Sequence, residues 1–170
     1  MNTTSNAAST NSAAFFSLVN HPLKFRWFLL QKLPAAYFSR LKVQHVSEDS
    51  CSVSVPYKWF TKNPFRSTYF ACLAMAAEMS TGILAMAHLY KRLPKTSMLV
   101  VAVEGKFYKK AIGKTTFTCN DGLLIQQTIE KAIALNEPQT NRILSSGYND
   151  KKELVAEFWI TWSFKTKSAA

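Results

Sequence analysis

The stretch Ser67–Tyr90, STYFACLAMAAEMSTGILAMAHLY, decides the fold because it is long, apolar and almost free of charge. Between Arg66 and Lys91 the only acid or fixed base is Glu78. The length of the run and its many Ala, Leu and Met residues predict a helix, although Gly82 weakens a helix interior locally. A helix that is apolar on all sides must be buried by something. A curved sheet wrapped around it would bury it, and the small side chains would allow a close approach.

A membrane span is the competing interpretation, because the same stretch is long enough to cross a bilayer. Glu78 would then lie near the centre of the span, with Ser80, Thr81 and Gly82 beside it. An acid at that depth costs roughly 2.5 to 3.5 kcal/mol. Alternating strands on both sides also fit a sheet better, so we expect a buried core helix and no membrane span.

Alternation with a period of two predicts the strands of this sheet. It is clearest over Leu154–Lys165, where every second residue, including Phe158, Ile160 and Trp162, points to one face. Shorter strands are expected over residues 41–46, 51–57, 98–108, 112–119 and 142–148. Two more helices are expected, one over 22–33 with Pro22 in its first turn, and one over 123–135 capped by Asn120 or Asp121.

The domain organisation follows from composition. Residues 1–14 are mostly Ser, Thr, Asn and Ala, which predicts a disordered tail. This tail has no basic start and no long apolar run, so it does not resemble a secretory signal, and a cytoplasmic location is expected by default. No repeat or boundary interrupts residues 15–167, so we expect them to form one α+β domain.

The net charge of +11 favours an acidic partner: a nucleic acid, an anionic membrane surface or a phosphorylated small molecule. Charge alone does not choose among them, but no stacking-sheet motif or recognition helix supports a nucleic-acid binder. The three cysteines, Cys51, Cys72 and Cys119, include no Cys-x-x-Cys pair, and the three histidines are scattered. No metal site and no disulfide framework are therefore expected.

Glu78 is the first candidate for chemistry. A buried carboxylate without partners tends to take up a proton, so it needs either polar neighbours or a task. The purely structural interpretation is that its carboxylate caps a loop or pairs with a nearby Lys or Arg. The functional interpretation is that it is a catalytic acid or base.

The run Asn63–Ala71, NPFRSTYFA, together with the acid fifteen positions after Asn63, resembles the active-site region of hotdog-fold thioesterases, in particular the phenylacetyl-CoA thioesterase-like branch. The resemblance covers residues 22–166 and implies a hotdog fold, in which an antiparallel sheet wraps around a long central helix. It also implies a homodimer, with pairing of dimers into a tetramer left open, and an acyl-CoA thioester as substrate with no further cofactor. The chain departs from the family where Tyr69, Phe70 and Ala71 replace His-Gly-Gly, and where the expected helix over 123–135 is inserted.

The resemblance implies roles for individual residues. Glu78 would be the base or nucleophile, and a backbone N–H of Phe70 or Tyr69 would face the thioester carbonyl oxygen. Asn63 would orient the water or hold the loop. Its purely structural interpretation is that it is a turn or cap residue before Pro64. Phe70 and Glu78 are eight residues apart, roughly 12 Å along a helix, so an antiparallel partner helix across a two-fold axis would be needed to bring both to one reacting centre.

Residues of the same region are candidates for substrate binding. Arg66 and Lys110 would hold the phosphates of coenzyme A, although each is also an ordinary surface cation. Phe65 and Tyr69 would line an acyl pocket. The predicted function is an acyl-CoA thioesterase; the alternative is a non-catalytic hotdog module that binds acyl-CoA or a fatty acyl chain.

Overall fold

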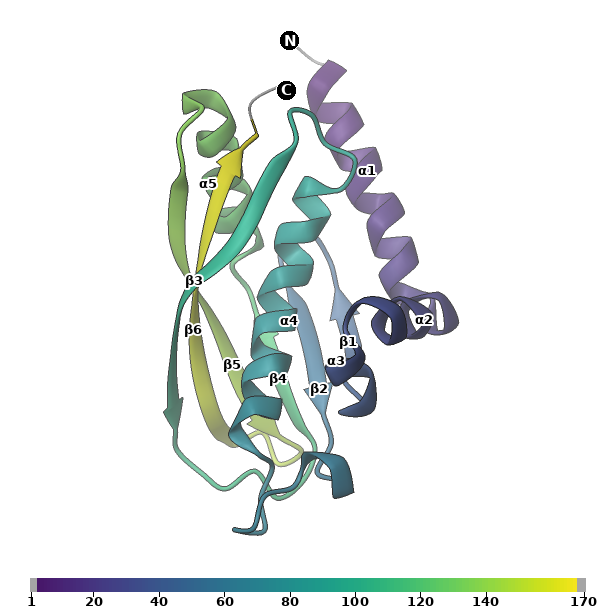
Figure 1. The fold of residues 1–170 in the computed structure, drawn as a ribbon, viewed down its shortest axis with the longest axis vertical. Coiled ribbons are helices and arrows are strands. Elements are labelled where there is room, and N and C mark those ends of the chain that lie inside the picture. Colours follow the sequence, from purple (N-terminus) through teal and green to yellow (C-terminus); the bar gives the residue numbers. More distant parts are fainter. Residues whose placement is uncertain (1–2, 168–170) are drawn as a thin grey trace.

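The computed structural model describes residues 3–167, with side chains from residue 11 onward. Six strands form one antiparallel sheet in the order β1-β2-β4-β5-β6-β3, and the long helix α4 lies along one face of it (Figure 1). The strands are β1 (Lys42–Val46), β2 (Cys51–Val55), β3 (Thr96–Phe107), β4 (Thr115–Cys119), β5 (Gln139–Asn149) and β6 (Leu154–Thr166). The helices are α1 (Thr3–Asn20), α2 (Pro22–Lys32), α3 (Pro34–Phe38), α4 (Phe70–Leu89) and α5 (Gly122–Leu135), with a 3-10 turn η1 at Trp59–Thr61. The expected α+β sheet around a long central helix is confirmed.

Helix α4 is the core of the fold. Its length and composition would suit a bilayer, but 67% of its apolar window is buried inside the protein, as in a core helix. Two of its hydroxyl groups are tied to the sheet. Ser80 Oγ lies 2.8 Å from Ser145 Oγ of β5, and Trp162 Nε1 of β6 donates to Thr81 Oγ1 at 2.9 Å. These two buried hydroxyl groups of the apolar helix are thereby satisfied.

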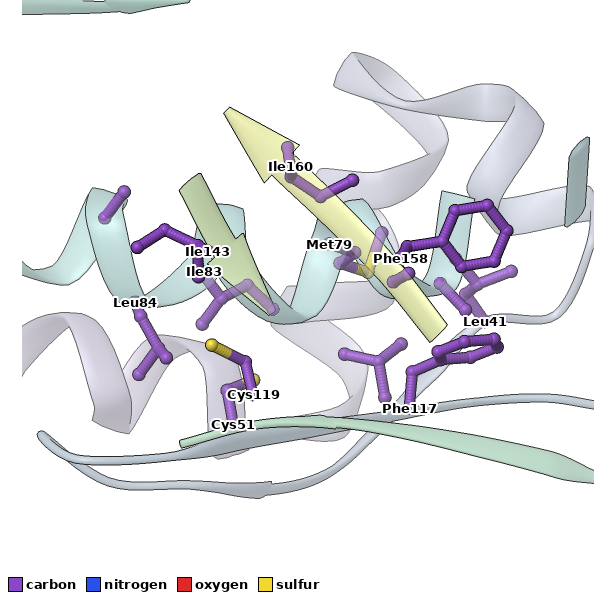
Figure 2. Packing of buried hydrophobic residues seen from close by; sticks show 14 of the residues in the cluster. Leu41, Cys51, Met79, Ile83, Leu84, Phe117, Cys119, Ile143, Phe158 and Ile160 are labelled. Carbon is purple, nitrogen blue, oxygen red and sulfur yellow. The ribbon is translucent and has the colours of Figure 1, made fainter. Parts of the chain in front are cut away.

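The sheet contributes the other half of the core. From Ala156 onward the even-numbered residues of β6 are buried, as the alternation predicted, including Phe158, Ile160 and Phe164. Figure 2 shows Met79 and Ile83 of α4 among the side chains of the strands. Strand β2 ends at Val55, directly before Pro56, because proline cannot continue the ladder.

The N-terminal segment differs from the expected disordered tail over residues 1–14. Residues 3–20 form the helix α1, while residues 1–2 lie outside the described residues. Phe15 and Val19, one helical turn apart, are buried, and the ring of Phe15 lies 5.4 Å from that of Tyr90. Ser12 Oγ donates to the carbonyl oxygen of Ala87. The polar composition misled because tertiary docking on α4, and not local propensity, fixes this helix.

Two further details differ from the sequence-based expectation. Helix α2 ends at Lys32, close to the expected end, but Pro34 then begins a short helix, α3, that was not expected, because proline is well tolerated at the first helical position. Asp121, expected as a capping side chain for α5, makes no capping hydrogen bond. Its carboxylate accepts the backbone N–H of Leu144 at 3.1 Å and so fastens the start of α5 to β5.

Gly122 tests how tightly α5 is fitted to the fold. A Cβ atom there would lie 2.1 Å from the carbonyl oxygen of Glu48, a backbone atom that cannot swing away. We predict that Gly122→Ala lowers stability by about 1–3 kcal/mol through overpacking, measured as a lower Tm. Gly113→Ala is the matched control, since its nearest new contact would be 3.9 Å away, and its Tm should stay near that of the wild type. Equal effects of the two substitutions would contradict this account.

Candidate functional site

Asn63 organises the loop that leads into α4. Its side-chain oxygen accepts three hydrogen bonds, from the backbone N–H of Phe65 at 3.0 Å and from the N–H and hydroxyl of Ser67, both at 3.2 Å. The backbone N–H and the hydroxyl of Thr68 both donate to the carbonyl oxygen of Ala111, which ties the loop to the segment after β3. The side chain of Asn63 therefore holds the loop. Ser67 was missed by the sequence analysis, although Asn followed by a small hydroxyl residue is a frequent loop pairing.

The first turn of α4 presents free backbone donors. Tyr69, with φ −61° and ψ 133°, precedes the helix, and its N–H is already used on the carbonyl oxygen of Thr61 at 2.7 Å. The N–H groups of Phe70 and Ala71 have no backbone acceptor outside the helix among residues 3–167, as expected for the start of a helix. Of the two donors expected from the sequence, Phe70 is thus the free one, and Ala71 adds a second. Such donors at a helix N-terminus stabilise negative charge.

A cleft of 630 Å³ opens beside these donors. It brings together five of the residues expected in the site, namely Asn63, Phe65, Tyr69, Phe70 and Lys110. The rings of Tyr69 and Phe70 lie edge to face, 5.0 Å apart, and about half of each side chain is exposed. Lys109 is neutralised by Glu153 at 2.6 Å, whereas Lys110 has no acidic partner in the described part of the chain. The cleft therefore combines aromatic walls, free N–H donors and one unpaired cation.

Arg66 lies apart from this group. It lines a neighbouring cleft of 440 Å³, whose other lining residues are Tyr57, Lys62, Asn63 and Pro64. Its backbone has a φ of 59°, in the left-handed region that residues other than glycine rarely adopt.

Glu78 is partly buried in a separate cavity of 60 Å³. Nothing in residues 11–167 donates a hydrogen bond or forms an ion pair to its carboxylate, so it neither caps a loop nor pairs with a cation in this protomer. Burial raises the pKa of the Glu78 carboxyl above its ordinary value. Beneath it lies Gly82, where even a Cβ atom would come within 3.2 Å of Glu78 Oε1.

Half of the residues that line the Glu78 cavity come from outside α4. Phe15 of α1 and Phe25 and Phe28 of α2 cover it, together with Leu33 and Met98. These covering residues were not predicted from the sequence, although the spacing of Phe25 and Phe28 already indicated one face of a helix. No residue lines both this cavity and the cleft at the start of α4.

The edge strand β3 runs from the Glu78 cavity to the cleft at the start of α4. It pairs with β6 on one side only, and its other edge is open. Leu99, Val101 and Val103 are each more than half exposed, at 64%, 52% and 54%. Met98 near one end lines the Glu78 cavity, and Phe107 at the other end lines the cleft. An exposed apolar edge strand of this length is a surface that natural proteins cover.

The antiparallel sheet wrapped around α4 is the hotdog fold, as solved structures with the same architecture confirm. The chain belongs to the family described as Domain of unknown function (DUF4442), which matches residues 23–164. No curated protein matches the sequence.

Three similar solved structures illustrate the likeness. A Pseudomonas aeruginosa protein of unknown function, named a probable thioesterase, is 17% identical with a TM-score of 0.73, covering 86% of this chain and 97% of its own. A Chlorobaculum tepidum protein of unknown function is 14% identical with a TM-score of 0.72, covering 85% and 93%. A mutant thioesterase from Pseudomonas aeruginosa is 14% identical with a TM-score of 0.61, covering 81% and 90%. At these identities the likeness establishes the fold.

The raised pKa of Glu78 makes stability depend on pH. A folded-state pKa above the unfolded value means that the folded protein loses stability as pH rises from the ordinary value through the raised one. We predict that Glu78→Gln raises the Tm at pH 8 by roughly 2–4 °C, the shift that about 1 kcal/mol produces at this chain length. The gain should shrink as the pH falls toward 4. Thermal unfolding across this range checks it, with the exposed Glu137→Gln as a control expected to show no gain. A lower Tm for Glu78→Gln at pH 8 would contradict it.

Proposed function

We propose that this protein is an acyl-CoA thioesterase whose site is completed by a second copy of the chain. The observation that carries the proposal is the partly buried carboxylate of Glu78, held without a partner and with a raised pKa. A fold has no structural reason to keep such a group. The relatives in fold that are named thioesterases support the same reaction class.

Pairing of the open β3 edges would unite the two half-sites. If two copies of β3 run antiparallel about a two-fold axis at Val103, the β-bulge between Val100 and Ala102 sets Met98 of one copy opposite Phe107 of the other. Met98 belongs to the Glu78 cavity and Phe107 to the cleft. Each Glu78 would then face the cleft of the other copy, and the exposed edge would be covered.

The chemistry then needs few groups. Glu78 takes a proton from a water molecule, which attacks the thioester carbonyl carbon. The developing oxyanion accepts hydrogen bonds from the N–H groups of Phe70 and Ala71. When the carbon–sulfur bond breaks, Glu78 returns the proton to the coenzyme A thiolate. A raised pKa makes this carboxylate a stronger base than an exposed one. Direct attack by Glu78, giving an anhydride that water hydrolyses, uses the same ionised carboxylate.

Substrate binding would use the rest of the cleft. Lys110 has no acidic partner in the described residues and is available for a phosphate of coenzyme A. Phe65, at 75% exposure, and the neighbouring rings of Tyr69 and Phe70 offer apolar surface to the acyl chain. Asn63 acts as a positioning residue, because its carbonyl oxygen is occupied by its own loop.

The direct test is hydrolysis of a panel of acyl-CoAs, from short to long chains and including phenylacetyl-CoA. We predict that the wild type releases coenzyme A and that Glu78→Gln lowers kcat/KM by about 10²–10⁴, the usual contribution of a general base. Glu137→Gln serves as the matched control and should retain wild-type activity. Undiminished hydrolysis in Glu78→Gln would remove the carboxylate from the mechanism.

Phe70→Pro tests the oxyanion donor and the shared site together. Proline removes only a free N–H at the first helical position, and the extended backbone of Tyr69 suits a residue before proline. We predict a loss of about 10²–10³ in kcat for Phe70→Pro, while Phe70→Ala, which keeps the N–H, retains far more activity. Mixing Phe70→Pro with Glu78→Gln subunits under exchange should restore about a quarter of wild-type activity, because half of the dimers would hold one intact site of two.

Size-exclusion chromatography with light scattering provides the control that subunits have exchanged, using tagged and untagged chains. Two inactive variants that form mixed dimers and yet recover no activity would show that each site lies within one chain.

A non-catalytic acyl-CoA binder is the second candidate. It is favoured by the bulk of Tyr69 and Phe70 at the cleft and by the small size of the Glu78 cavity, 60 Å³. This candidate predicts a higher Tm in the presence of acyl-CoA with no release of coenzyme A. The same panel therefore separates the two functions.

A further inference from the structure

Helix α2 has two apolar faces, and only one of them is buried. Phe25 and Leu29 are 8% and 2% exposed and pack into the protein. On the opposite side Leu23, Trp27 and Leu30 follow the spacing i, i+4, i+7 and are 74%, 61% and 36% exposed. These three residues form what we call the outer ridge of α2. A ridge this apolar on a surface helix calls for a partner.

The charge around the outer ridge has one sign. No Asp or Glu precedes Glu48 in the sequence, whereas residues 22–42 carry five cations, all exposed: Lys24, Arg26, Lys32, Arg40 and Lys42. None of the five forms an ion pair within the described part of the chain. By helical geometry Lys24 lies on one flank of the ridge and Arg26 on the other. The ridge is therefore framed by unpaired positive charge.

A basic cleft adjoins the same helix. It has a volume of 490 Å³ and runs between α2 and the start of β1, with Arg26, Arg40 and Lys42 in its lining. The remaining lining is largely apolar and includes Val19, Leu29 and Leu41. The arrangement, three cations around an apolar floor, suits a phosphate attached to a hydrocarbon chain.

We propose that α2 is a docking helix for anionic phospholipid bilayers. It would lie in the plane of the membrane surface, with the outer ridge in the boundary between headgroups and acyl chains and its cations on the phosphates. Apolar residues on one face of a helix, Lys and Arg along its flanks and a Trp at the centre are the features of such interfacial helices.

Two other partners fit the surface less well. A second copy docked ridge to ridge about a two-fold axis would set each group of five unpaired cations against the same group, and like charges across an interface are costly. Nucleic acid would use the cations, but its contact surfaces on proteins are polar and leave an apolar ridge without a role. An anionic lipid surface satisfies both the charge and the ridge.

The position of α2 connects docking to the site; this step rests on the proposed function. The buried face of α2 supplies Phe25 and Phe28 to the cavity that contains Glu78. A helix with its side chains is about 10–12 Å thick, so docking would hold Glu78 about that far below the lipid surface. Long acyl chains, which partition into bilayers, would reach the site from that side. Docking thus points to long-chain acyl-CoAs as the substrate class.

The experiment is co-sedimentation of the full-length protein with vesicles of phosphatidylcholine alone and with added phosphatidylglycerol. We expect the protein to bind the mixed vesicles and to bind vesicles of phosphatidylcholine alone at least about ten-fold more weakly. Binding to the mixed vesicles should weaken as the salt concentration rises. Leu23→Glu should weaken binding about ten-fold or more, because burying one Leu is worth roughly 1.5–3 kcal/mol. Leu123→Glu is the matched control on α5, where Leu123 is 59% exposed, and it should bind like the wild type.

Three results would overturn the proposal: no sedimentation with mixed vesicles, equal loss in Leu23→Glu and Leu123→Glu, or a change in oligomeric state on Leu23→Glu that accounts for its loss. Preferential binding to RNA or DNA over vesicles would assign the surface to nucleic acid instead. Glu78→Gln should sediment like the wild type. Docking can therefore fail or succeed independently of hydrolysis.

Discussion

The burial of α4 is the constraint around which the other elements are arranged. A helix with no polar face leaves its backbone hydrogen-bonded internally but must hide its whole circumference. The sheet hides one side, and the residues closest to it are small or carry a hydroxyl that finds a partner, as Ser80 does in Ser145. The sheet cannot reach the remaining side, so α1 and α2 cover it through Phe15, Phe25 and Phe28. Glu78 lies under this second cover, where packing is looser than against the sheet.

The same constraint leaves β3 incomplete. The sheet curls around α4, and β3, as its last strand, diverges from the helix toward its C-terminal end (Figure 1). Val103 and Phe107, which share a sheet face with buried residues of β6, are left half exposed. One protomer therefore buries most of its central helix but leaves the strand beside it half exposed. The proposed dimer would cover this strand and would also complete the site, so one interface would serve stability and catalysis together.

The sequence predicted what depends on local pattern. The alternation of β6 and the uninterrupted apolar run of α4 identified both elements, because burial of one strand face or of a whole helix leaves its period in the sequence. It also identified five of the residues that line the cleft, and four of them, Asn63, Phe65, Tyr69 and Phe70, lie just before or at the start of the helix. The prediction failed where distant contacts decide. The helical state of α1 depends on Phe15 and Val19 meeting α4, and nothing in a run of Ser, Thr, Asn and Ala shows that meeting in advance.

Arg66 and Glu78 show most clearly which features of the site could not be predicted from the sequence. A spacing of fifteen residues suggested that Asn63 and Glu78 cooperate, yet the two line different cavities in one protomer. Arg66 lines a different cleft from its neighbours Phe65 and Ser67, and its backbone is left-handed, a local conformation that residue spacing does not report. The environment of Glu78 is likewise set by α2, some fifty residues earlier in the chain. If α2 also contacts lipid, as we propose, an element that helps to bury Glu78 would also present the site to a bilayer, and the apolar character of both faces of α2 would have a single explanation.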